Sequence, residues 1–138
     1  MASKNQYFLK DKKAQIYLKM DGKTDSDGFR GERYYPIAPV PVWCYSRQLS
    51  QQDISYSYLR GVQETRIFVF NHYSNVDVYD LVQYCGKWYR ITRVDTQDDY
   101  HGDLYVYVEN AIAGWLPKND ELQPYTPGIL ENRKKDAL

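Results

Sequence analysis

The sequence contains few of the residues on which most catalytic and metal sites depend. Only two histidines and two cysteines occur among its 138 residues. No Cys-x-x-Cys or His-x-x-x-His pair is present, and structural zinc sites need ligands at such paired spacings. A phosphate-binding Gly-Lys-Ser/Thr loop and a nucleophile elbow are also missing. The sequence therefore predicts a protein that is not an enzyme and that needs no metal or cofactor.

The chain also lacks a charge imbalance and a long apolar run. Its 18 Lys and Arg residues balance 18 Asp and Glu residues, and the charges are dispersed. This disfavours a main role in binding duplex DNA, because proteins with that role carry a stripe of basic residues on their surface. No segment approaches the roughly 20 apolar residues of a membrane span, and we expect no signal peptide. For Cys44 and Cys85 we accordingly expect reduced, buried thiols rather than a disulfide.

Tyrosine, by contrast, is abundant, with 15 residues. A tyrosine combines a large apolar body with a polar tip, so it suits a surface that a partner later covers. Such residues are enriched at protein–protein interfaces. The alternative is that these tyrosines only cover the faces of a small sheet, and both interpretations remain open.

Short strand-like segments separated by turn signals make up the middle of the chain. Proline cannot donate to a ladder, so pairing after residue 36 should begin near Val42. Expected strands cover 13–20, 42–47, part of 62–71, the hairpin 81–95 and 103–110, and a short helix is expected within 50–61. The fold class predicted is mainly β: a small β-barrel or sandwich of about six strands with one short helix, a long loop and extended termini.

The length fits a single domain with one core. We expect an N-terminal arm over 1–12, a barrel-like domain over 13–113 and an extended C-terminal tail over 114–138, where three prolines interrupt the pattern. The segment RIFVFN is apolar on both faces and should be covered on both sides. The predicted core consists of Ile16, Leu18, Trp43, Ile67, Val69, Tyr89, Ile91, Val106 and Val108.

The order of these segments is similar to that of a known family. A first strand and a polar segment lead to Val42-Trp43-Cys44, and the hairpin Tyr84 to Ile91 has the form Tyr-x-Gly-x-x-Tyr-x-Ile. An alternating strand from Leu104 to Val108 follows. Over roughly residues 13–111 the chain resembles the head–tail joining, or head-closure, proteins of tailed bacteriophages. It departs from their pattern at Asn71-His72, where Arg-Tyr is usual, and in the tail from Gly114.

The resemblance implies a structural protein of the phage neck, located in the virion and assembled in the host cytoplasm. Such proteins form a ring below the portal and adaptor, continue and close the DNA channel after packaging, and offer a docking surface to the tail. The implied partners are further copies of the chain, adaptor or portal proteins above and tail-terminator proteins below. Genomic DNA would pass through the channel without sequence-specific binding, and no membrane is involved.

Two segments are the predicted functional sites. The polar segment 21–35 would be the channel or gate loop, or else a solvated connection, because long loops without structure are uncommon unless functional or disordered. Its candidate residues are Asp21, Gly22, Lys23, Asp25, Asp27, Gly28, Arg30, Gly31, Glu32 and Arg33. Candidate subunit-interface residues in the tail are Trp115, Leu116, Tyr125, Ile129 and Leu130.

Three alternatives remain open at this stage. The first is a tail-completion or tail-terminator protein of a phage. The second is a small barrel of the oligonucleotide-binding type, in which Tyr and Trp would stack on single-stranded nucleic acid, although a neutral chain lacks the basic lining of such grooves. The third is an enzyme built from dispersed Asp and His residues, which no motif supports.

Overall fold

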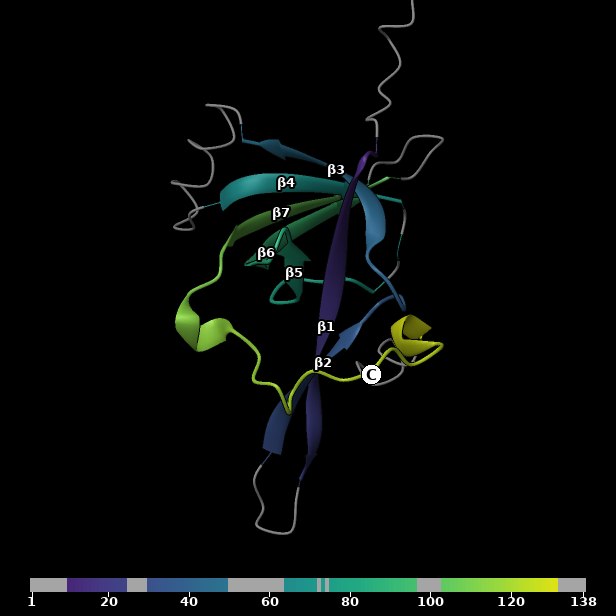
Figure 1. Cartoon of the computed structure of the whole chain (residues 1–138), viewed down its shortest axis with the longest axis vertical. Coiled ribbons are helices and arrows are strands. Elements are labelled where there is room, and N and C mark those ends of the chain that lie inside the picture. Colours follow the sequence, from purple (N-terminus) through teal and green to yellow (C-terminus); the bar gives the residue numbers. More distant parts are fainter. Residues whose placement is uncertain are drawn as a thin grey trace, which may run out of the picture.

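A computed structural model describes residues 10–24, 30–49, 64–71, 73, 75–96 and 103–131. Seven strands and one short 3-10 helix are assigned within these ranges (Figure 1). In chain order they are β1 (Lys12–Thr24), β2 (Arg30–Pro36), β3 (Val42–Gln48), β4 (Glu64–Phe70), β5 (Leu81–Tyr84), β6 (Lys87–Thr96), β7 (Leu104–Asn110) and η2 (Ala113–Trp115). No helix in the described part of the chain is long and apolar enough to cross a membrane.

Six of these strands form a closed antiparallel barrel. The order β1-β3-β4-β7-β6-β5 returns to β1, because β5 pairs with β1 through Gln15, Ile16 and Tyr17. Closure leaves the barrel without a free sheet edge. The predicted mainly-β, barrel-like fold is therefore confirmed, and β2 is an additional strand outside the barrel.

Strand β1 is long because it belongs to two structures at once. Its first half lies in the barrel, where Ala14 pairs with Val42 of β3. Tyr17 pairs with both Pro36 of β2 and Leu81 of β5, so these two strands lie on opposite edges of β1. Beyond Tyr17, β1 and β2 continue together as a two-stranded extension that projects from the barrel (Figure 1). We call this extension, residues 18–24 and 30–35, the arm.

The core fills the barrel with alternate residues of each strand. The largest fully buried side chains, Phe68 and Phe70 of β4 among them, meet Ile16, Ile91 and Val106 in one cluster. All predicted core residues are buried except Trp43. The prediction for Trp43 was wrong because Cys44 is the inward-facing residue of this strand, so its neighbour faces outward and is 53 % exposed.

Strand β4 is covered on both faces, as its sequence predicted. Ile67 and Val69 alternate with Phe68 and Phe70, and all are fully buried. Only Phe68 and Phe70 belong to the main core cluster. The helix expected within 50–61 lies outside the described residues.

The two cysteines are free thiols, but they differ in exposure. Cys44 is buried, as predicted, and burial raises its pKa to about 12. Cys85 is exposed, contrary to the prediction. It shares a two-residue turn with Gly86 between Tyr84 and Lys87, with positive φ at both residues, 52° and 76°. Primed hairpin turns of this kind lie at the end of a sheet, which is why the Cys85 side chain faces solvent.

The predicted loop over 21–35 is largely strand. Strand β1 continues to Thr24 and β2 begins at Arg30, with Asp21 opposite Glu32 and Met20 opposite Arg33. The glycines and charges of this segment suggested a loop because it has no apolar alternation. A hairpin that pairs with itself away from the core does not need that alternation, so the strand signal was absent.

The predicted extended tail also packs back on the molecule. Tyr34 of β2 donates its backbone N–H to the carbonyl of Glu121 and accepts from the N–H of Gln123, both at 2.9 Å. Residues 111–123, here called the strap, thus run from the end of β7 to the outer edge of β2 (Figure 1). Ile129, further on, is buried against the core.

Candidate functional site

The arm holds seven of the ten residues predicted as a gate. Asp21, Gly22 and Lys23 lie in β1, and Arg30, Gly31, Glu32 and Arg33 lie in β2, whereas Asp25, Asp27 and Gly28 lie outside the described residues. Glu32 is fixed on both carboxylate oxygens: Lys19 Nζ is 3.1 Å from Oε1, and the Tyr34 hydroxyl donates to Oε2 at 3.0 Å. The structure thus gives one of these residues, Glu32, a defined position beside a pocket.

The residues predicted as interface anchors fall into two groups. Trp115 lies flat on Arg90, with the guanidinium carbon 3.4 Å from the ring centroid. Ile129 is buried, and Leu130 packs against the core while its carbonyl accepts from Asn75 at 2.8 Å. These three have partners within the chain, and their role as subunit-interface anchors stays a prediction. Leu116 and Tyr125 are exposed, so their side chains are accessible to a neighbouring subunit.

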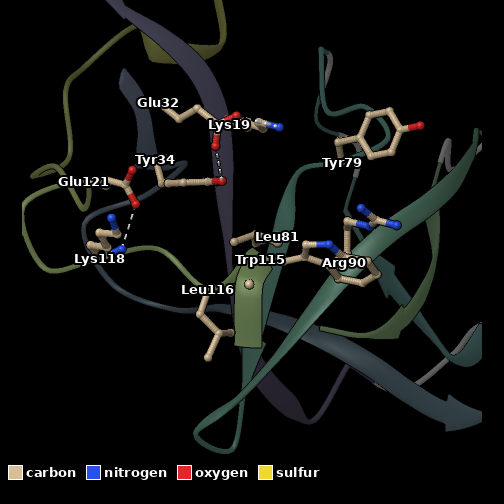
Figure 2. Close-up of a pocket in the computed structure, with 11 residues that line it drawn as sticks. Lys19, Glu32, Tyr34, Tyr79, Leu81, Arg90, Trp115, Leu116, Lys118 and Glu121 are labelled. Atoms are coloured by element: carbon tan, nitrogen blue, oxygen red, sulfur yellow. Dashed lines mark hydrogen bonds and ion pairs between the residues drawn. The ribbon is translucent and has the colours of Figure 1, made fainter. Parts of the chain in front are cut away.

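A pocket of about 480 Å³ lies between the arm, the outer surface of the barrel and the strap (Figure 2). Most of its lining surface is polar. The lining residues are Lys19 of β1, Glu32 and Tyr34 of β2, Tyr79 before β5, Leu81 of β5, Arg90 of β6, and Gly114, Trp115, Leu116, Lys118 and Glu121 of the strap.

Three charged groups of the pocket wall, those of Lys19, Glu32 and Arg90, are held in ion pairs. Lys19 pairs with Glu32. Arg90 donates from Nε and Nη2 to Oε1 of Glu109, at 3.2 and 2.7 Å. The backbone N–H of Lys118 donates to Oε1 of Glu121 at 2.8 Å. Fixed donors and fixed acceptors therefore stand side by side on the wall.

The hydroxyl of Tyr34 is a permanent donor at this site. Burial raises the pKa of Tyr34 well above its ordinary value, and the hydrogen bond to Glu32 and the negative charges of Glu32, Glu121 and Asp80 raise it further. The group thus stays protonated at every physiological pH. It donates to Glu32, and a dashed line marks this hydrogen bond in Figure 2.

Tyr79 stands at the edge of the pocket in a strained backbone conformation. Its φ is 73°, a left-handed value that costs a non-glycine residue free energy. The backbone is held there because Tyr79 N–H donates to the carbonyl of Ile91, while the buried Asp80 carboxylate accepts from the N–H groups of Lys19 and Asp77, each at 2.9 Å. The residue is 57 % exposed, with the Arg90 guanidinium carbon at 5.2 Å and Lys19 Nζ at 5.9 Å from its ring centroid.

Sequence analysis singled out Glu32, Trp115 and Leu116 from this pocket but did not find the pocket. Lys19, Tyr79 and Arg90 are far apart in the chain, and no motif joins them. The feature of the sequence that pointed to this region was the aromatic hairpin 81–95, whose outer face supplies Leu81 and Arg90 to the pocket. In the described part of the chain, no group of three or more His, Cys, Asp or Glu residues could hold a metal ion.

No family model and no curated protein matches the sequence. Among solved structures, the chain is similar to the solution structure of protein SF1141 from Shigella flexneri 2a, with a TM-score of 0.64 and 12 % sequence identity. The match covers 79 % of this chain and 98 % of that one. At this identity the similarity shows the fold, a closed barrel with one added strand, and nothing further.

Proposed function

We propose that the protein is a structural component of the neck of a tailed bacteriophage. Copies of the chain would form a ring below the portal and adaptor, continue the DNA channel, close it after packaging and offer a docking surface to the tail. The observation that carries this proposal is the arm, a paired hairpin that projects beyond a closed barrel (Figure 1).

The arm suits an element that reaches into a channel. It is regular, since Leu18 pairs with Tyr35 and Met20 with Arg33, and the strap braces its outer edge at Tyr34. A projecting hairpin without such a brace would be marginally stable.

The charge of the segment 21–35, predicted as the gate, also fits passage of DNA. Between residues 21 and 35 the sequence has the acidic residues Asp21, Asp25, Asp27 and Glu32 and the basic residues Lys23, Arg30 and Arg33. These charges nearly cancel. A strongly positive element would hold the genome through phosphate contacts, whereas DNA in the neck has to move.

Contacts with neighbouring subunits and with the proteins above and below require exposed surface residues, because the barrel itself has no free edge. Large apolar side chains are exposed at Val40, Trp43, Ile112, Leu116 and Tyr125. Aromatic and apolar residues in such positions are typical of interface cores.

The proposal is tested by phage particles made without this protein. Electron microscopy should show filled heads without tails, and the heads should lose DNA during purification. Restoring the wild-type protein in trans should restore tailed particles that retain their DNA. Infectious particles of normal morphology would contradict the proposal, and stable full heads beside tails of irregular length would assign the protein to the tail end instead.

A further inference from the structure

The pocket between arm, barrel and strap has a charge pattern that argues against an ionic ligand. Lys19 is neutralised by Glu32, and Arg90 by Glu109. A phosphate or carboxylate ligand would have to compete with these carboxylates for the same cations. Its charge would also lie close to Glu32 and Glu121, which line the pocket. Repulsion between a negatively charged ligand and these two carboxylates is unfavourable, so the geometry favours a neutral ligand.

The polarity of the wall argues against an apolar ligand or the apolar anchor of a protein partner. Pockets for drug-like molecules and for hot-spot side chains are mainly apolar, whereas most of this lining is polar. An apolar group would cover Lys19, Glu32 and the Tyr34 hydroxyl without offering them hydrogen bonds. The volume of about 480 Å³ is within the roughly 300–1,000 Å³ typical of small-molecule sites.

The third observation is the aromatic side chain at the pocket edge. Tyr79 is held at a φ of 73° by its own hydrogen bond to Ile91 and by those of its neighbour Asp80, and more than half of the side chain is nevertheless exposed. Strained residues of this kind persist only where the surrounding structure enforces them, and they cluster at active sites and ligand-binding sites. An exposed, rigid ring offers a flat apolar surface beside polar groups.

From these three observations we propose that the pocket binds a neutral saccharide. A sugar ring has an apolar C–H face that packs on the Tyr79 ring, and hydroxyls that both donate and accept. Those hydroxyls donate to the carboxylates of Glu32 and Glu121 and accept from the ammonium groups of Lys19 and Lys118. The inference does not depend on the proposed function in the phage neck.

The test is titration of the full chain with neutral sugars. Binding is measured by calorimetry and by tryptophan fluorescence, to which Trp115 in the pocket wall contributes. The probes are glucose, galactose, mannose, N-acetylglucosamine, maltose, lactose and N,N′-diacetylchitobiose, each to roughly 50 mM, which reaches the weak affinities expected for few contacts. Glucuronic acid, inorganic phosphate and an oligothymidylate serve as charged comparisons. Saturable binding of a neutral sugar, with weaker binding of the charged probes, is the expected result.

Two variants separate binding from folding. Tyr79→Gly removes the ring and also relieves the left-handed strain, so the protein should melt no lower than wild type while its sugar affinity falls at least about tenfold. Trp43→Ala removes an exposed aromatic side chain on β3, outside the pocket, and should leave affinity unchanged. The inference is overturned if no neutral sugar saturates the protein, if a charged probe binds more tightly, or if Tyr79→Gly binds like wild type.

Discussion

At the scale of single residues, Asp80 determines how the loop before β5 joins the rest of the barrel. Its carboxylate is fully buried and accepts hydrogen bonds from the backbone of β1, at Lys19, and from its own loop, at Asp77. A carboxylate that accepts from backbone N–H groups is among the stronger polar interactions in a protein. The same residue keeps its neighbour Tyr79 in the left-handed conformation.

Asp80→Ala should therefore be costly. The substitution leaves two backbone N–H groups without their acceptor, and hydrogen bonds to charged groups contribute about 1.5–3 kcal/mol each. We expect the free energy of unfolding to fall by about 3 kcal/mol or more, measured by urea denaturation. Asp77→Ala is the matched control: its side chain is exposed and accepts only from the adjacent Val78 N–H in the described contacts, so a loss below about 1 kcal/mol is expected. Equal losses in both variants would contradict this role of Asp80.

The two cysteines should react at very different rates. Thiolates are the reactive form, and the pKa of Cys44 lies at about 12 because the residue is buried, whereas Cys85 is exposed in a turn. A thiol reagent at pH 8 should label one cysteine per native chain, and two after denaturation. Labelling of both in the native protein would show that Cys44 is accessible.

The raised pKa of Cys44 also predicts how stability changes at alkaline pH. The folded state holds this proton more tightly than the unfolded chain, whose cysteine titrates near 9. The contribution of the protonated Cys44 thiol to the free energy of unfolding is therefore complete below pH 9 and is lost as the pH rises towards 12. Cys44→Ala, compared with wild type by denaturation between pH 8 and 11, should show a smaller loss of stability. An identical loss in both proteins would contradict the assignment to Cys44.

At the scale of elements, the sequence predicted those strands whose residues meet the core. The hairpin of β5 and β6 was visible because apolar residues flank a glycine-containing turn, and β3 was placed from Val42 because prolines precede it. The arm was missed because its strands pair with each other outside the core. The strap was missed because its contacts, such as Tyr34 with Glu121 and Gln123, join segments about 90 residues apart, which no local pattern records.

The arm can be shortened without disturbing the barrel. Replacing residues 22–31 by Asn-Gly closes the hairpin at the Asp21–Glu32 pair with a two-residue turn of the kind that β5 and β6 already use. Because the replacement leaves the sequence of the buried core residues, such as Ile16, Phe68 and Ile91, unchanged, thermal unfolding should change little. Particles that carry this variant should leak packaged DNA or fail to join tails. If the isolated variant unfolds, the removed segment is required for the fold and the gate hypothesis fails.

At the scale of the whole molecule, the closed barrel makes folding and assembly separable. The class of fold followed from short alternating segments, but the pocket did not, because its walls come from the arm, two barrel strands and the strap. If the chain assembles as proposed, contacts to the barrel would have to use exposed side chains, because closure hides the edges of its strands. Two of the predicted anchors, Leu116 and Tyr125, remain exposed on the segment that follows β7.

Tyr125→Asp tests the proposed role in assembly, because Tyr125 is not part of the pocket wall and does not belong to the main core cluster. The isolated variant should unfold within about 1 kcal/mol of wild type, as most exposed positions do. A charge placed in the core of an interface costs far more than that, since it loses its hydration when the partner covers it. We therefore expect this variant to fail to restore tailed particles when it replaces the wild-type protein. Asn119→Asp, which adds the same charge at an exposed position of the strap, should restore them. Full complementation by Tyr125→Asp would place the subunit contacts elsewhere on the barrel.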